Sequence, residues 1–225
     1  MPMIFIHGAG ANPSVWHFQT IHFKDAVAVQ LPGHPNGSGR ATVNDYADAV
    51  EEEVERLQVH QPILVGHSMG GAIAIELALR KKPVKALVLV GTGARLRVRP
   101  EFLRLIEQNY EGAAKLIASW SVASSDPILV DRIVRDLLMI KPEVTLGDFK
   151  ACDQFDSMDR IGEIVCRTLI VCGEDDRMTP KKYSEYLRQK IVGSELAVVP
   201  GAGHGVMLEK HREFNRVLDA FLASL

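Results

Sequence analysis

A serine between two glycines is the strongest chemical signal in the chain. Residues 65–71 read Val-Gly-His-Ser-Met-Gly-Gly, which makes Ser68 the centre of a G-x-S-x-G pattern. An apolar run precedes it and a small-residue helical pattern follows, which predicts a sharp strand-to-helix turn. Glycines suit such a turn because a side chain would clash there. We therefore predict that Ser68 is a nucleophile at a helix start; an incidental serine in a glycine-rich turn is the alternative.

A serine hydroxyl needs a general base within hydrogen-bonding reach. Of the eight histidines, His204 has the most suitable setting, in Pro-Gly-Ala-Gly-His-Gly at 200–205, just after the last apolar run. Such a loop returns to the carboxyl edge of a parallel sheet. A carboxylate must then orient the histidine. Three acids compete for that role after the preceding apolar run, and their spacing alone does not separate them: Glu174, Asp175 and Asp176.

The elements that must position these residues are short apolar runs alternating with helical patterns. The runs rarely alternate with polar residues, which is typical of strands buried on both faces of a parallel sheet. We predict strands at 3–6, 26–31, 63–65, 86–90, 168–171 and 195–199. We predict helices at 43–57, 71–80, 180–190 (with Thr179 as N-cap) and 212–222. The result is an α/β fold with a doubly wound, mostly parallel six-stranded sheet.

Residues 94–160 interrupt this alternation. They contain no convincing strand, and we predict helices at 100–110, 112–121, 127–140 and 142–151. A helical insertion between two strands is expected to form a cap over the ligand-binding end of the sheet. We therefore divide the chain into a core (1–93 and 161–225) and a cap (94–160).

These motifs together resemble the α/β-hydrolase family, and within it the small, capped, esterase-like group. The resemblance spans nearly the whole chain. It rests on the His-Gly pair at 7–8, Leu-Pro-Gly-His at 31–34, the Ser68 turn, G-x-x-D-x-x-x-P at 173–180 and the final Gly-x-Gly-His. The order serine, acid, histidine is also that of the family. Many relatives begin with two further strands that this core lacks. Strand 26–31 should therefore lie at a sheet edge, which we expect a partner subunit to cover in a homo-oligomer.

The resemblance implies a role for further residues. The acid of G-x-x-D falls on Asp176, with Asp175 as the fallback and Glu174 behind it. The N–H groups of Ala9 and Met69 would form an oxyanion hole. In the pocket, Trp16 either walls the site or packs in the core. Trp120, in the cap, is expected to contact an acyl or alcohol group.

A third pocket candidate, Arg95, begins a cluster with Arg97 and Arg99. This cluster either binds a substrate carboxylate or forms a solvated entry face.

The function implied is that of a serine hydrolase that cleaves a carboxylic ester of a small acyl substrate through an acyl-enzyme. The same triad also supports C–C bond hydrolysis, acyl transfer, peroxyacid formation and lyase-type menaquinone-pathway chemistry. A non-catalytic ligand-binding member is the other class, which the presence of all three triad residues disfavours.

Composition restricts the partners and the compartment. The 225 residues are 47% hydrophobic with a net charge of -2, so nothing indicates nucleic-acid binding. Three cysteines without paired spacing indicate neither a disulfide framework nor a zinc site. No basic leader precedes the first apolar run, and no run approaches the roughly 20 apolar residues of a membrane span. We expect a cytoplasmic protein without membrane contact, metal or cofactor.

Overall fold

The computed structural model describes residues 2–124 and 126–225. Six parallel strands form one sheet in the order β2-β1-β3-β4-β5-β6. They are β1 (Met3–Ile6), β2 (Ala26–Val29), β3 (Ile63–His67), β4 (Ala86–Val90), β5 (Arg167–Gly173) and β6 (Glu195–Val199). β1, β3 and β4 are buried along their whole length, as strands covered on both faces should be. The predicted parallel α/β sheet is confirmed, and β2 lies at one of its edges.

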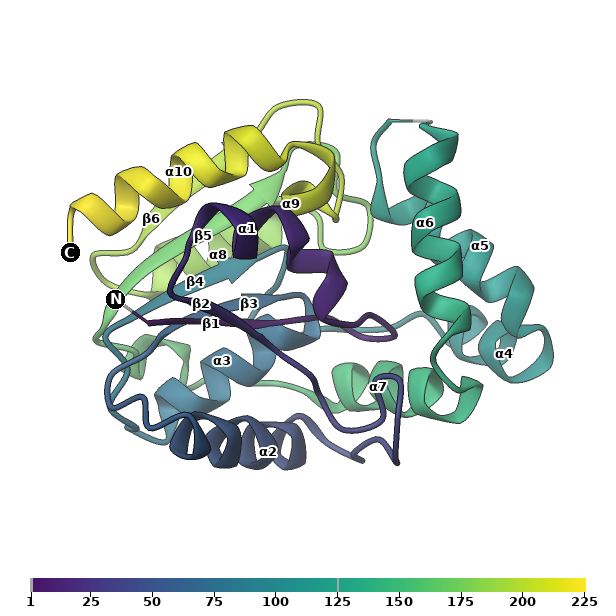
Figure 1. Cartoon of the computed structure of the whole chain (residues 1–225), viewed down its shortest axis with the longest axis horizontal. Coiled ribbons are helices and arrows are strands. Elements are labelled where there is room, and N and C mark those ends of the chain that lie inside the picture. The colour runs from purple at the N-terminus through teal and green to yellow at the C-terminus, as the bar shows by residue number, and fades with distance from the viewer. Residues whose placement is uncertain (1, 125) are drawn as a thin grey trace.

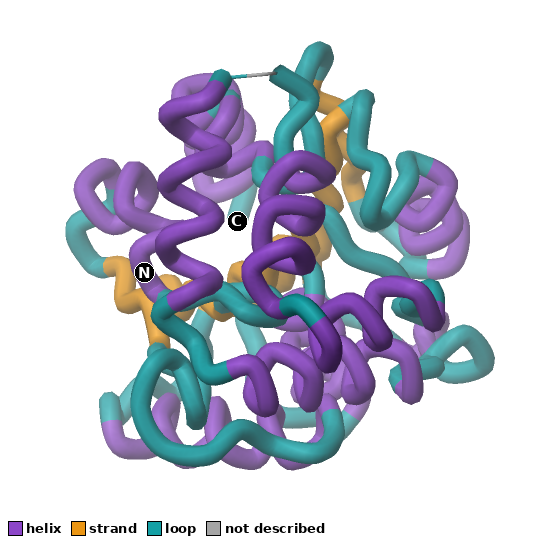
Figure 2. Tube along the Cα trace, turned by 90° about the vertical axis from the view of Figure 1, so that its right-hand side faces the viewer, coloured by secondary structure: helices purple, strands orange, loops and turns teal. Residues whose placement is uncertain are grey.

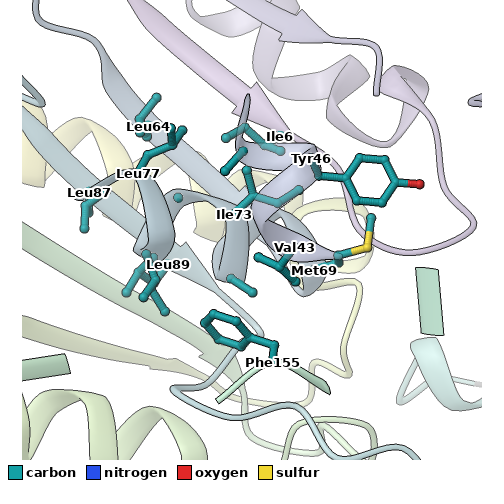
Figure 3. Close-up of a cluster of buried hydrophobic side chains, with 14 of the residues drawn as sticks. Ile6, Val43, Tyr46, Leu64, Met69, Ile73, Leu77, Leu87, Leu89 and Phe155 are labelled. Atoms are coloured by element: carbon teal, nitrogen blue, oxygen red, sulfur yellow. The ribbon is translucent and has the colours of Figure 1, made fainter. Parts of the chain in front are cut away.

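Helices cover both faces of the sheet (Figure 1). On one face α2, α3 and α8 bury their apolar side chains in a single cluster with the strands. Figure 3 shows part of it, including Ile73 of α3 and Leu64 of β3. On the other face α1, α9 and α10 pack against a second cluster. The bounds are α1 (His17–His22), α2 (Val43–Arg56), α3 (Met69–Leu79), α8 (Lys182–Lys190), α9 (Val206–Glu209) and α10 (His211–Ala223), with 3-10 turns η1 (Pro13–Trp16) and η2 (Ile161–Glu163).

The sheet order places a crevice where the functional residues are expected. β1 pairs with β2 on one side and with β3 on the other, so the chain reverses its direction across the sheet between β2 and β3. Ligands in open α/β sheets bind outside the carboxyl ends of the strands at such a switch point. The loop after β1 and the Ser68 turn after β3 meet at this point.

Between β4 and β5 the described residues form four α-helices before the turn η2: α4 (Pro100–Gln108), α5 (Tyr110–Ser121), α6 (Pro127–Leu138) and α7 (Pro142–Gln154). They lie beyond the carboxyl ends of the strands, at the right of Figure 1, and Figure 2 views the molecule from that side. A third buried cluster holds them together, with Phe102 of α4, Ile117 of α5, Leu137 of α6 and Phe149 of α7. This insertion therefore has an apolar interior of its own.

Some predicted boundaries differ from those of the structure. The strand predicted at 26–31 ends at Val29, because Leu31 turns away from the sheet and donates its N–H to Nε2 of His7 (3.3 Å). The helix predicted from Pro180 begins only at Lys182, and its N-cap residue is Lys181, so Thr179 as N-cap was wrong. No helix in the described part of the chain is long and apolar enough to span a bilayer.

Candidate active site

Ser68 lies on the sharp turn between β3 and α3. Its backbone has φ 54° and ψ -117°, a left-handed conformation that side-chain-bearing residues rarely adopt. The flanking glycines are required by close packing. A Cβ on Gly66 would lie 2.2 Å from the carbonyl oxygen of Gly70, and a Cβ on Gly70 would lie 2.2 Å from that of Ile6. A hydrogen bond from the Ser68 N–H to the Val90 carbonyl (2.9 Å) ties the turn to β4.

His204 and Asp176 form a buried pair. Nδ1 of His204 lies 2.9 Å from Oδ2 of Asp176, and both side chains are almost completely shielded from solvent. A proton on Nδ1 is therefore donated to the carboxylate, which leaves the lone pair of Nε2 free to accept a proton. Burial alone would raise the pKa of Asp176, but His204 and the hydrogen bonds to the carboxylate outweigh it, so the pKa lies below its ordinary value. Asp176 is therefore a carboxylate at neutral pH.

Thr179 completes the surroundings of this pair, and the sequence did not indicate that role. Its hydroxyl donates to Oδ2 of Asp176 (2.8 Å) and lies 3.2 Å from Nδ1 of His204. The N–H groups of Met178 and Thr179 donate to Oδ1 of Asp176 (2.9 and 2.8 Å). Because its hydroxyl is used here, Thr179 does not cap α8. Its position three residues after Asp176 was the only signal available.

Ser68 and His204 line one cavity of about 310 Å³ between the sheet and the cap. Its wall is mostly apolar. Cap residues contribute Phe102, Ile117, Trp120, Ile133, Leu137 and Phe149. A cavity of this size and lining can take a small, largely apolar molecule with its polar centre near Ser68.

The loop after β1 lies against the Ser68 turn. A Cβ on Gly8 would lie 3.1 Å from Cβ of Ser68. Ala9, the next residue, lines the cavity, and Met69 is the first residue of α3. Neither the Ala9 nor the Met69 N–H donates a hydrogen bond to another described residue. Two backbone donors next to Ser68 are therefore available to an anionic oxygen.

Two further histidines, His7 and His67, are buried beside the site. Nδ1 of His7 contacts the Gly8 carbonyl (3.0 Å), and Nε2 of His67 contacts the His204 carbonyl (3.0 Å). Burial, followed by the charge of His34, lowers the pKa of His7 to about 3. Burial, followed by the charge of His204, lowers the pKa of His67 to about 3. Both imidazoles are therefore neutral.

Of the three predicted pocket residues, Trp120 lines the cavity of the described chain and Arg95 and Trp16 do not. Trp120 lines the cavity, as do Arg97 and Arg99, whereas Arg95 is not among the lining residues that the structure describes. Arg95 is exposed and lies 3.8 Å from Asp156, with which its backbone also forms a bridge.

Trp16 is fully buried in the core and does not reach the cavity lining of the described chain. Its ring packs on those of Phe5 and Phe214 (centroids 4.8 and 6.1 Å apart). Of the two interpretations of Trp16, core packing is therefore the one that the structure has.

Two acidic residues that no motif in the sequence singles out tie the cap to the site. Asp148 of α7 accepts a hydrogen bond from the Gly10 N–H (2.9 Å). Glu209 of α9 accepts from the N–H groups of Gly203, Ala123 and Ser124 (2.6, 3.1 and 2.6 Å). Asp148 was detectable as an acid four residues after Val144 and four before Cys152, both on the buried face of their helix. The described residues contain no group of three or more His, Cys, Asp or Glu side chains placed to hold a metal ion.

Comparisons with known proteins identify relatives of one family. Residues 3–217 match the model of the alpha/beta hydrolase family. The chain is 26% identical over 260 residues to 2-hydroxy-6-oxo-2,4-heptadienoate hydrolase of Pseudomonas putida, which covers 99% of this chain and 89% of that protein. It is 24% identical over 242 residues to pimeloyl-[acyl-carrier protein] methyl ester esterase of Yersinia enterocolitica, over 97% of this chain and 92% of that protein.

Solved structures agree with this placement. A thermophilic esterase is 37% identical with a TM-score of 0.88, covering 99% of this chain and 89% of that one. An esterase of Exiguobacterium antarcticum has a TM-score of 0.93 at 21% identity, over 99% and 92% of the two chains, and therefore supports the fold. The family match spans the sheet, the cap helices and every residue of the site described above. The chain therefore belongs to the alpha/beta hydrolase family and is an enzyme of that superfamily.

Proposed function

We propose that the protein is a serine hydrolase that cleaves carboxylic esters through an acyl-enzyme intermediate. Ser68 is the nucleophile, His204 the general base and Asp176 the residue that orients it. One observation carries the proposal: the His204 ring, held by Asp176 at 2.9 Å, lines the same cavity as a serine in a left-handed backbone conformation. A buried carboxylate, an imidazole and a serine in this order form the proton path of acyl transfer.

The reaction runs in two half-reactions. Nε2 of His204 takes the proton of the Ser68 hydroxyl as the oxygen attacks the ester carbonyl, and Asp176 stabilises the resulting imidazolium. The tetrahedral intermediate collapses, the alcohol leaves with the proton from His204, and an acyl-serine remains. Water then loses a proton to His204, attacks the acyl-serine and releases the acid. The sum is ester plus water to acid plus alcohol.

The negative charge of the tetrahedral intermediate would be stabilised by the Ala9 and Met69 N–H groups. Both are free of other described partners; Ala9 lines the same cavity as Ser68, and Met69 follows Ser68 in the chain. Backbone donors of this kind are preorganised, and removing one costs about 100- to 1,000-fold in kcat in a comparable enzyme. The position of Ser68 at the N-terminus of α3 adds a favourable dipole.

Replacing Ser68 by alanine tests the proposal. Ser68→Ala should reduce hydrolysis of 4-nitrophenyl butyrate by at least about a thousandfold, because the nucleophile is removed. It should also abolish labelling by a fluorophosphonate probe, which requires an activated serine. Ser119→Ala, at an exposed cap position, is the matched control and should retain both properties. Unchanged ester turnover in Ser68→Ala would contradict the mechanism.

C–C bond hydrolysis is the second candidate. Relatives that support it are named 2-hydroxy-6-oxo-2,4-heptadienoate hydrolase and 2-hydroxy-6-oxo-6-phenylhexa-2,4-dienoate hydrolase, at 26% and 27% identity over 99% of this chain. A panel of simple esters and vinylogous diketones separates the two reactions. Preference for the diketones in kcat/KM would replace the ester proposal, with Ser68→Ala showing whether the same serine is used.

A further inference from the structure

Asp148 belongs to the cap, yet its carboxylate lies against the loop after β1. The side chain is completely buried. Its Oδ2 accepts a hydrogen bond from the Gly10 N–H (2.9 Å) and lies 2.7 Å from Nε2 of His34. Its Oδ1 accepts from the hydroxyl of Tyr46 (2.5 Å). One carboxylate of α7 therefore joins the loop after β1, the loop after β2 and helix α2.

These hydrogen bonds are needed because burying a carboxylate costs free energy unless the group is paired and hydrogen-bonded. Burial, followed by the Asp148 charge, raises the pKa of Tyr46, so its hydroxyl stays protonated and donates. Nδ1 of His34 faces a second acceptor, the Pro32 carbonyl (2.9 Å). Each oxygen of Asp148 thus has a donor, and removing any one leaves a polar group without its partner.

The contact with Gly10 matters because Ala9 precedes it. A peptide group is planar, so fixing one of its atoms orients the whole group. The Gly10 N–H, held by Asp148, belongs to the peptide group that follows Ala9. The Gly8 carbonyl, which accepts from the Ala11 N–H (3.3 Å) and contacts His7 Nδ1 (3.0 Å), belongs to the group that contains the Ala9 N–H. Both peptide groups around Ala9 are therefore held.

Side chains of the cap also pack closely against the loop after β1. Gly10 has φ 61°, and a Cβ there would lie 2.7 Å from Leu137 and 3.1 Å from Thr145, both cap residues. The loop after β1 therefore has little room to adopt another conformation while Asp148 is in place.

We propose that Asp148 is a positioning residue that holds the Ala9 N–H in the orientation needed for the oxyanion hole. The cap then contributes to transition-state stabilisation as well as to the wall of the cavity. This inference rests on the proposed serine-hydrolase function. It predicts that loss of the acceptor for the Gly10 N–H lowers kcat while the Michaelis complex forms almost as before.

Three variants separate positioning from general stability. Asp148→Leu removes the acceptor and keeps the branched arrangement of side-chain heavy atoms, although its methyl groups are larger than the carboxylate oxygens. Asp148→Asn keeps one oxygen for the Gly10 N–H. Tyr46→Phe breaks the same buried network at its other end and leaves the Gly10 contact in place. Each is measured for kcat and KM on 4-nitrophenyl butyrate, for inhibition by a trifluoromethyl ketone that forms the tetrahedral adduct, and for stability in urea.

Asp148→Leu should lower kcat by about 10- to 100-fold, because a displacement of about 1 Å at a catalytic group has effects of this size. Its KM should change by less than about threefold, and the trifluoromethyl ketone should bind more weakly in proportion to kcat/KM. Asp148→Asn should recover most of the lost kcat. Tyr46→Phe should lose stability but keep kcat within about threefold of the unmodified protein.

Two results would overturn the inference. One is a kcat for folded Asp148→Leu within threefold of the unmodified protein. The other is a loss of kcat in Tyr46→Phe as large as that in Asp148→Leu. This result would mean that kcat falls whenever the buried network is destabilised, whether or not the Gly10 contact is kept. If Asp148→Leu does not fold, Asp148→Ser takes its place, since its shorter side chain leaves room for water and does not reach Gly10. Absence of ester turnover and of fluorophosphonate labelling in the unmodified protein would instead reject the proposed function.

Discussion

Thr179 shows how one hydroxyl tunes the proposed proton path. Its hydroxyl donates a hydrogen bond to Oδ2 of Asp176, the same carboxylate oxygen that faces Nδ1 of His204. Hydrogen bonds to a charged acceptor favour the ionised form, so Thr179 helps to keep the pKa of Asp176 low even though burial would raise it. The hydroxyl also restricts the rotation of the carboxylate, which the histidine needs in a fixed orientation.

Thr179→Val tests this role at nearly constant volume. A hydrogen bond to a charged group contributes about 1.5–3 kcal/mol, so we expect a loss of about 10- to 150-fold in kcat with little change in KM. Ser184→Ala is the matched control, because the Ser184 hydroxyl is buried in α8 beside Cys172 and not at the Asp176–His204 pair. Steady-state kinetics on a nitrophenyl ester decide the question, and equal kcat values for the two variants would reject the role of Thr179.

At the scale of elements, α9 connects the loop of His204 to the end of α5. The Glu209 carboxylate accepts from one amide of the histidine loop and from two amides that follow the cap helix. Burial would raise the pKa of Glu209, but these N–H groups outweigh it and the pKa lies below its ordinary value. Its stabilising contribution is therefore present above the pKa of the unfolded chain and is lost as the pH falls through the folded-state pKa.

Glu209→Gln should lower the free energy of unfolding by about 1–2 kcal/mol, because an amide NH₂ would replace one acceptor oxygen and face a backbone N–H. Glu213→Gln is the control, since Glu213 forms an exposed pair with Arg216 (2.9 Å) that is worth little. Urea unfolding at pH 7.5 measures both. Equal stability of the two variants would show that the Glu209 contacts contribute nothing beyond a surface ion pair.

At the scale of the whole molecule, the two buried neutral histidines couple stability to pH. His7 and His67 have a pKa near 3 in the folded protein, against 6.5 in an exposed chain. Between these values the unfolded chain binds more protons than the folded one, so stability rises with pH. Their contribution is complete above about pH 6.5 and is lost as the pH falls towards 3.

Each histidine should therefore cost about 2 kcal/mol of stability between pH 7.5 and 5, and unfolding at pH 5 should take up about two protons at these sites. Urea unfolding measured across this range gives the slope. His67→Gln should remove about one proton from it, whereas His60→Gln, at an exposed position, should leave it unchanged. Equal slopes for the unmodified protein, His67→Gln and His60→Gln would mean that other groups cause the loss of stability at low pH.

How much could be predicted from the sequence differs between kinds of residue. The Ser68 turn was predictable because its glycines, the strand before it and the helix after it are neighbours in the chain. The misplaced Thr179 shows the opposite case. A threonine before a proline favours an N-cap locally, but its hydroxyl instead binds a carboxylate and contacts a ring that lies 25 residues further along the chain. The local N-cap preference of Thr179 was outweighed by a hydrogen-bond partner that only the tertiary fold brings near.

The sequence by itself determined the parallel sheet, because the period and length of the apolar runs specify strands covered on both faces. It also indicated the residues that the proposed mechanism uses, since Ser68, Asp176 and His204 each follow a strand of the parallel sheet. Only the tertiary structure decided which wall residues face the cavity, placing Trp120 there and Trp16 in the core. It alone brought Asp148 to Gly10 across 138 residues of chain, because contacts between distant segments depend on how helices pack on the sheet and leave no periodic pattern.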